Sequence, residues 1–576
     1  MYFSKMINSV KQKPGLFLCV FSLCVLFFLI LPLNLSVICA NENQGFAFTW
    51  GEALLRWKEL ACGRGILFVL LYSLVLKVFG FNSYSIVAIH IIETVVLFLI
   101  GILIYLIVKQ ALRNDLYGGL AVLFWVIFVC TPIGMSDLIV ELASHYNLNE
   151  ENLCVLFSLF SLFCLLVSGL FNAEQSLMPS IKEKLFSAFA GIFAICSMMS
   201  KANGAILLIA TLIWFLLNFF IRNEYFKYAI KKTQYYFFGL LGSLLFFNIV
   251  LYVLNGDLLT TWRDYFLLGN YTNEHLNSCK LLFANFFYFM TRHTNSISNF
   301  ILFFFILLLL LFGLIRNFVK RNDLSNISNF WLLISLWGIG NVCAIVAPGT
   351  YQPYYYHLIW SVAAILLSFG LYELFLKFSG KKIFLALIIL FVIVFFFCRI
   401  GVTVPSHYKL TKALNALSVF KQPQSFQDPV LPYVAKTSVR PRIFQLADLV
   451  NRLLPDKDST FYIVDFSQKG FIAFTPLSYI YAKRYPPTSV DAGLLGVPTI
   501  LKSKLKILQR DLSRRKPEII ILSKTISLQP WQVQDLTPFV QWLTGVIKEE
   551  YRYETYVNLL MKNDQQETFF ILRKIK

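Results

Sequence analysis

A short charged segment, residues 39–64, interrupts the otherwise largely apolar N-terminal part of the chain. Its charged side chains are three acids and three bases: Glu42, Glu52, Glu59, Arg56, Lys58 and Arg64. A positioned carboxylate can take a proton from a substrate, and a cation can neutralise an anionic group. We therefore look for chemistry at this segment first.

Other polar side chains lie at similar interruptions further along the chain. Residues 135–151 hold Asp137, Glu141, Glu150 and Glu151 without any Lys or Arg. Lys201 lies in a very short break, and Tyr354 and His357 bound an aromatic segment. Glu93 lies inside an apolar run, where an ionisable group by default indicates function or a buried partner. His90, one turn earlier, is a candidate partner.

The composition is that of a membrane protein. Of 576 residues, 57% are hydrophobic, 17% aromatic and only 14% charged, whereas soluble domains carry about 25% charged residues. The net charge is +20, but no basic stripe with interleaved aromatics indicates nucleic-acid binding. No Cys/His spacing typical of a metal site appears.

Apolar runs long enough to cross a bilayer recur up to about residue 400. We predict eleven spans, near 16–39, 84–108, 118–134, 152–171, 186–200, 203–220, 235–254, 295–315, 329–347, 354–374 and 383–400. The apolar segment 66–79 is too short to cross, so we predict an interfacial or re-entrant helix there.

Lys and Arg residues set the expected orientation. With the N-terminus in the cytoplasm, the loops on that side carry more Lys and Arg than the opposite loops, as the positive-inside rule requires. An odd number of spans then puts the tail, the 39–64 segment, Glu150, Glu151 and Lys201 on the outer side.

The tail differs from the rest. Residues 1–400 form the predicted membrane domain, and 401–576 alternate helical and strand patterns, which indicates a small α/β domain. We expect helices at 443–454, 501–514 and 539–549, and strands at 460–465, 518–522 and 567–572. The basic surface of the tail is either solvated or placed against anionic lipid.

The order of these elements resembles the GT-C glycosyltransferases, particularly bacterial members similar to protein O-mannosyltransferases and the lipid A aminoarabinose transferase. The matching elements follow the order of the chain. They are the acidic first loop with a segment ending Val78-Phe79-Gly80, then Asn149-Glu150-Glu151, Ser200-Lys201, Gly269-Asn270-Tyr271, the Tyr354–His357 segment, and KPEIIIL at 516–522.

The resemblance implies a multi-pass protein of the bacterial inner membrane with a periplasmic tail. It implies an inverting transfer of a sugar from a polyprenyl-phosphate donor to a glycolipid, polysaccharide or protein acceptor. An acid in the first loop would accept the proton of the acceptor hydroxyl. Cations and hydrogen-bond donors would stabilise the phosphate leaving group. No nucleotide is implied, and a divalent cation is possible but is not indicated by a motif.

Carried over residue by residue, the resemblance makes Glu42 the expected base, with Glu52 or Glu59 next. Glu151 would orient the acceptor or a cation. The other expected substrate-binding residues are Asn43, Arg64, Glu150, Lys201, Tyr354 and His357. Two positions depart from the family pattern: Asn43 stands where an acid is expected, and Gly63-Arg64-Gly65 replaces a Pro-Pro-Gly turn.

Each assignment has a plainer alternative. Glu42 can simply solvate a loop, Glu151 can cap a helix, Lys201 can snorkel, and Tyr354 and His357 can belong to an interfacial aromatic belt. Two other function classes also stay open. One is a transporter of polyprenyl-linked saccharides, and the other is a non-catalytic scaffold, which Asn43 favours.

Overall fold

The computed structural model describes most helices of the membrane domain and the core of the tail. The described residues are 13–34, 42–57, 65–129, 150–171, 179–221, 223–255, 257–267, 306–315, 326–346, 356–378, 441–456, 458–464, 478–479, 482–488, 498–524, 530–560 and 566–575.

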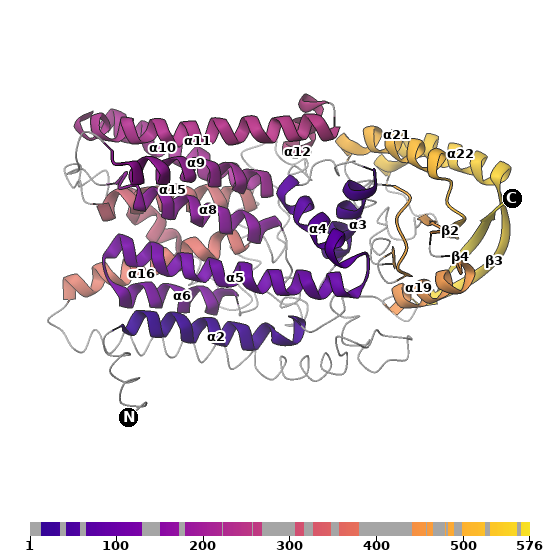
Figure 1. Ribbon diagram of the computed structural model, residues 1–576, viewed down its shortest axis with the longest axis horizontal. Coiled ribbons are helices and arrows are strands. Elements are labelled where there is room, and N and C mark those ends of the chain that lie inside the picture. Colours follow the sequence, from indigo (N-terminus) through magenta and orange to yellow (C-terminus); the bar gives the residue numbers. More distant parts are fainter. Residues whose placement is uncertain are drawn as a thin grey trace.

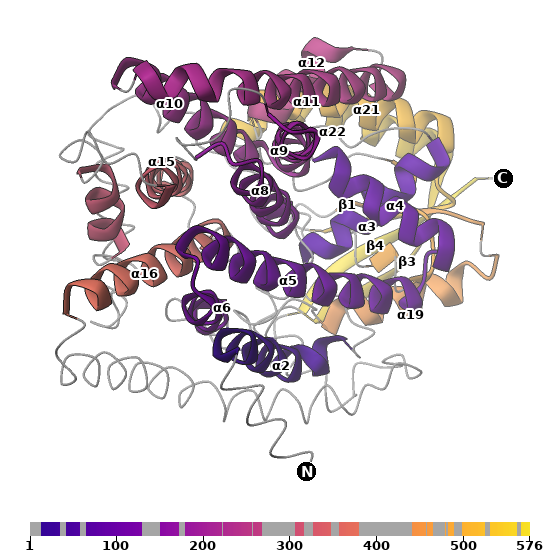
Figure 2. The ribbon, with the colours of Figure 1, turned by 60° about the vertical axis from the view of Figure 1, so that its left-hand side comes forward.

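The described residues between 13 and 378 form a helical bundle (Figure 1). Its labelled elements are α2 (Pro14–Asn34), α3 (Glu42–Trp57), α4 (Ile66–Phe79), α5 (Ser83–Leu112), α6 (Asp115–Val129), α8 (Glu150–Val167), α9 (Ile181–Ser200), the 3₁₀ turn η1 (Ala202–Gly204), α10 (Ala205–Ile221), α11 (Asn223–Asn255), α12 (Leu258–Leu267), α15 (Asn326–Val346) and α16 (His357–Phe378). Figure 2 shows α8 and α9 in the middle of the bundle, between α10 and α11 on one side and α5, α6 and α2 on the other.

Seven of the predicted spans are confirmed as helices long and apolar enough to cross a membrane. The predictions at 16–39, 118–134 and 295–315 correspond to shorter apolar helices within the described residues, Pro14–Phe28, Asp115–Val129 and Ile306–Ile315. The eleventh, 383–400, lies outside the described part of the chain.

Helices α3 and α4 lie between the bundle and the tail (Figure 1). Helix α4 has 14 residues and ends at Gly80, whose φ of 78° suits a glycine at a helix C-terminus. The helix therefore has the bounds expected from the sequence. Helix α3 packs closely against α4, and the Ser73 hydroxyl of α4 donates a 2.9 Å hydrogen bond to the Gly51 carbonyl of α3.

Charged contacts fix the end of the bundle farthest from the tail, here called the far end. Asp115 accepts hydrogen bonds from the backbone N–H groups of Gly15 (2.8 Å) and Leu16 (3.0 Å), and so caps the start of α2. Lys232 of α11 pairs with Glu183 in the first turn of α9 at 2.8 Å. The opposite end, here called the tail-side end, is where α5 and α8 begin and α9 finishes.

The tail is an α/β domain, as predicted. Its elements are α19 (Pro441–Leu453), β1 (Phe461–Val464), α21 (Pro498–Arg515), β2 (Ile519–Ser523), α22 (Pro530–Glu550), β3 (Tyr551–Leu560) and β4 (Gln566–Lys574). All six predicted helices and strands are present, and β3 is an additional strand. The predicted domain boundary at 400/401 lies outside the described residues.

The four strands are ordered β1-β2-β4-β3, with β1 and β2 parallel and the other neighbouring pairs antiparallel. Alternate side chains face opposite sides of the sheet. Phe461, Ile463 and Ile519 face a core that continues into the membrane domain. Tyr462 and Ile520 face a second core beneath α21 and α22.

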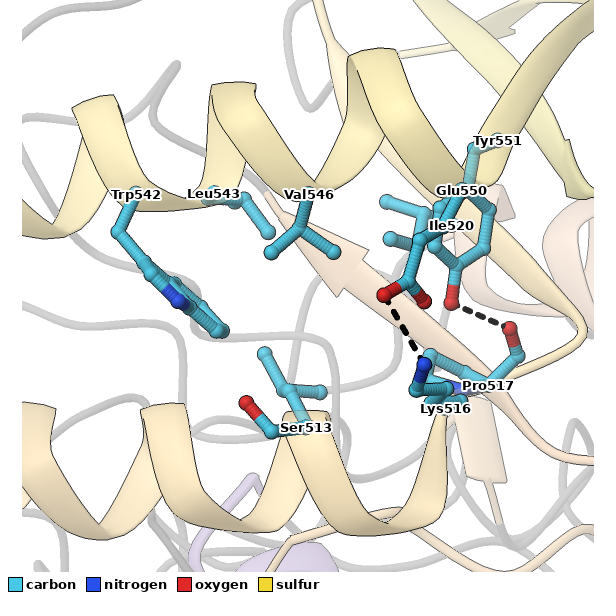
Figure 3. Close-up of a pocket in the computed structure, with 10 residues that line it drawn as sticks. Ser513, Lys516, Pro517, Ile520, Trp542, Leu543, Val546, Glu550 and Tyr551 are labelled. Carbon is cyan, nitrogen blue, oxygen red and sulfur yellow. Dashed lines mark hydrogen bonds and ion pairs between the residues drawn. The ribbon is translucent and has the colours of Figure 1, made fainter.

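A cavity of about 220 Å³ lies between α21 and α22 in the tail. Figure 3 shows Trp542 at one side of it and the Lys516–Glu550 ion pair, 3.0 Å long, at the other. The Tyr551 hydroxyl donates a 2.7 Å bond to the Pro517 carbonyl beside that pair. This cavity belongs to the tail. Lys516, Pro517 and Ile520 of the 516–522 segment line it, but none of the predicted site residues does.

Candidate active site

The central feature of the tail-side end is an ion pair between Lys201 and Glu151. Glu151 lies in the first turn of α8, and Lys201 ends α9 with an extended backbone (φ −157°, ψ 143°). The Glu151 side chain is 3% exposed and that of Lys201 17%. The helix end therefore directs the ammonium group inward to a carboxylate, and the pair joins two segments 50 residues apart.

Glu150 and Gly65 lie next to this pair. The Gly65 backbone N–H donates a long bond of 3.4 Å to Glu150 Oε1. A Cβ atom at Gly65 would lie 1.9 Å from the carbonyl oxygen of Ser200, so only glycine fits at this contact. The end of the first loop is therefore pressed against the end of α9, one residue from Lys201.

Tyr265 closes another side of the site, and the sequence reasoning assigned it no role. Its hydroxyl donates to the Met198 carbonyl in the last turn of α9. Burial raises the pKa of Tyr265 well above its ordinary value, and the nearby Glu150 carboxylate adds to the shift. The Tyr265 hydroxyl is therefore a neutral donor at physiological pH. Its location in the long segment of mixed polarity between the spans predicted at 235–254 and 295–315 was the one available signal.

A second polar contact lies behind the first turn of α8. Asn152 Nδ2 donates a 2.5 Å hydrogen bond to Glu93 Oε1. Glu93 is 1% exposed. Burying an ionisable side chain inside an apolar span is costly, and Asn152 is the described hydrogen-bond partner of this one. The bond ties α5 to the turn that carries Glu150 and Glu151.

The structure therefore brings together Glu150, Glu151 and Lys201 from the predicted set. His357 is 2% exposed at the start of α16, a helix that packs against α6 and α8. Trp360, one turn later, stacks on Phe128 near the end of α6 with ring centroids 5.1 Å apart. His357 thus lies at the tail-side end of the bundle.

The remaining predicted residues are only partly covered by the structure. Helix α3 begins at Glu42, so Glu42 and Asn43 occupy its first turn, but their side chains are outside the described part. Arg64 directly precedes Gly65 in sequence and lies outside the described residues, as does Tyr354.

Glu52, the alternative base, has a structural environment of its own. It is 5% exposed and accepts a hydrogen bond from Arg56, one turn later on α3. Burial raises the pKa of Glu52, and the Arg56 bond opposes that shift. A carboxylate enclosed in this way is poorly placed to meet a substrate. Glu59, the other alternative, lies outside the described residues.

Among the described residues, no group of three or more His, Cys, Asp or Glu side chains is placed to hold a metal ion.

Comparison with known proteins yields a likeness of fold. No protein-family model matches the sequence, and no curated protein matches it. A crystal structure of the Archaeoglobus fulgidus oligosaccharyltransferase, tethered to an acceptor peptide containing the NVT sequon, matches with a TM-score of 0.50 and 12% identity, over 97% of this chain and 74% of that chain. The chain has the GT-C fold.

A second structure of this GT-C enzyme, in complex with an inhibitory peptide and a dolichol-phosphate, has a TM-score of 0.48 at 12% identity, over 97% of this chain and 74% of that chain. Both structures are archaeal, and the bacterial subgroup suggested by the motifs stays a prediction. The GT-C fold expected from the order of the loops is confirmed.

Proposed function

We propose that the protein is a GT-C glycosyltransferase that moves a sugar from a polyprenyl-phosphate-linked donor to an acceptor at the membrane surface. The observation that carries this proposal is the meeting of Glu150, Glu151 and Lys201 beside Gly65 at the tail-side end. The GT-C fold supports the same class of activity. The archaeal oligosaccharyltransferase is tethered to an acceptor peptide in its crystal structure. By analogy, the proposed acceptors include a protein as well as a glycolipid or a polysaccharide.

Lys201 is the proposed phosphate ligand. An ammonium group has three N–H donors, and the bond to Glu151 uses one of them. Its positive charge would attract the oxygens of a lipid phosphate, with Arg64 as a second cation from the first loop. As the sugar–phosphate bond breaks, negative charge grows on the departing phosphate, and these cations stabilise it.

Glu151 and Glu150 are the proposed orienting residues. Because Glu151 is held by Lys201, its free lone pairs have a fixed direction. They can accept a hydrogen bond from a sugar or acceptor hydroxyl and hold it for attack. Glu42 is the proposed base, which takes the acceptor proton as the new glycosidic bond forms with inversion.

The proposed setting follows the charge distribution. The tail-side end faces outward, the N-terminus lies in the cytoplasm, and the tail is periplasmic in a bacterial inner membrane. Tyr354 and His357 would contact the donor phosphate, with His357 at the start of α16, and Asn43 would contact the substrate from α3.

The test is transfer by the purified full chain in nanodiscs. Radiolabelled polyprenyl-phosphate sugars are supplied with envelope glycolipid, polysaccharide or peptide acceptors, and wild type is compared with Glu42→Gln and Lys201→Met. Loss of transfer in Lys201→Met with retained folding supports the site. Undiminished transfer in Glu42→Gln removes Glu42 as base. No transfer from any donor favours the scaffold reading that Asn43 suggests.

A further inference from the structure

A segment of the tail reaches the membrane domain at one aromatic side chain. Residues 482–488, here called the strap, connect described parts of the tail and carry Tyr485. The Arg56 guanidinium of α3 lies over the Tyr485 ring, 3.1 Å from its centroid. On another side the ring meets Phe81, with centroids 5.8 Å apart. Tyr485 therefore wedges between α3 and the start of α5.

The strap is fixed to the tail on the N-terminal side of Tyr485. The buried guanidinium of Arg484 donates to the carbonyl groups of Leu454 and Asp456, just after α19. Arg484 is 3% exposed, and its backbone N–H donates a 2.9 Å bond to the Tyr479 carbonyl.

The strap is also fixed on the C-terminal side. Arg515 of α21 donates a 2.9 Å bond to the Pro487 carbonyl. The Thr488 hydroxyl donates a 2.9 Å bond to Asp511, which is fully buried in α21. With one end tied to the segment after α19 and the other to α21, the strap holds Tyr485 at a set position within the tail.

Arg56 links Tyr485 to α3. The same guanidinium that covers Tyr485 also donates to the buried Glu52 carboxylate. A planar guanidinium can stack on a ring and bond a carboxylate at its edge at the same time. The strap, Arg56 and Glu52 thus form one continuous connection from α21 and the segment after α19 to the helix that begins at Glu42.

We propose that Tyr485 is a positioning residue, through which the tail holds α3 and so sets the first-loop acids relative to the Glu151–Lys201 pair. The α/β tail is then a structural part of the active site and not a separate module. This inference rests on the proposed function only for its effect on transfer. Its physical core, a tail that holds α3, is independent of any substrate.

The experiment is hydrogen exchange of the full chain in nanodiscs, read by mass spectrometry on α3 peptides. Tyr485→Ala should speed exchange of α3 amides by about tenfold, because the ring contact with Arg56 is lost. Tyr485→Phe keeps the ring and should match wild type. Tyr553→Ala, which removes a ring that is 57% exposed on β3, should leave α3 unchanged.

The variant Arg56→Lys distinguishes a lost contact between the tail and α3 from a general unfolding of the tail. It keeps a charge beside Glu52 but loses the planar group, so α3 should loosen while β2 and β4 stay protected. Unchanged α3 exchange in both Tyr485→Ala and Arg56→Lys would overturn the proposal. If α3 loosens but sugar transfer is unaffected, the hold on α3 stands and the assignment of Glu42 as base fails.

Discussion

Replacing Lys201 with methionine would leave the Glu151 carboxylate buried without its cation. Because the two side chains are only 17% and 3% exposed, the loss resembles that of a buried pair, for which removal of one partner costs about 3 kcal/mol. That is about a 150-fold change in the unfolding equilibrium. Converting both residues, as Glu151→Gln with Lys201→Met, removes the unpaired charge and should restore most of the stability.

Transfer should respond differently from stability. If Lys201 holds the donor phosphate, the double variant should still transfer sugar about tenfold to a hundredfold more slowly than wild type. This factor corresponds to the loss of one charge-assisted hydrogen bond. The assay pairs unfolding in mixed detergent micelles with initial rates of transfer.

The chain provides a matched control at the other end of α9. The Lys232–Glu183 pair has a similar burial, 6% and 16% exposed, but lies at the far end. Lys232→Met should also destabilise, and the double variant with Glu183→Gln should recover both stability and transfer. Wild-type transfer by the Glu151→Gln/Lys201→Met double variant would refute the reasoning, as would an equal loss of transfer from both double variants.

Three further outcomes follow from the contacts. Gly65→Ala should lower both the unfolding temperature and the transfer rate, because its Cβ would meet a backbone oxygen at 1.9 Å. In the control Gly242→Ala the new Cβ has no neighbouring atom within 4 Å, so the change should be neutral or stabilising by roughly 0.5–1 kcal/mol. Equal effects of the two variants would contradict this prediction. The raised pKa of Glu52 means that the folded chain holds this proton more tightly than the unfolded chain, so stability falls as the pH rises from about 4.5 towards the raised value. Glu52→Gln should remove that slope in unfolding temperatures recorded between pH 4 and 8, and an unaltered slope would show that Glu52 is not its source. Asn152→Ala should destabilise by about 2 kcal/mol, since the buried Glu93 carboxylate loses its donor; adding Glu93→Leu should recover most of this in the same unfolding assay, and a further loss would argue against the bond.

The sequence predicted helices and strands better than it predicted contacts between side chains. The apolar runs up to residue 374, the short helix at 66–79 and the strand predicted at 518–522 have strong local patterns. Within the described residues, the structure has a helix or strand at each of them. Strand β3 was missed because its side chains are mostly exposed and it follows α22 without a glycine or proline. Its strand conformation comes from pairing with β4, which is a tertiary effect.

The site shows the same limit more sharply. Local reasoning placed Lys201 and Glu151 on one membrane face. It left Lys201 between a phosphate contact and snorkelling, and Glu151 between orienting the acceptor or a cation and capping a helix. Their direct pairing depends on how α8 and α9 pack. Likewise, His90 was the nearest candidate partner of Glu93 in sequence, whereas the described bond comes from Asn152, 59 residues away. Spacing along one helix cannot reveal such contacts.

Strand β4, residues 566–574, lies between β2 and β3 although both precede it in the chain. A growing chain therefore lacks the middle of this sheet until its final strand has been made, since domains generally fold as units during synthesis. The membrane helices can be in place well before that. A chain interrupted shortly before residue 566 would then be inserted in the bilayer yet unable to complete the support of α3.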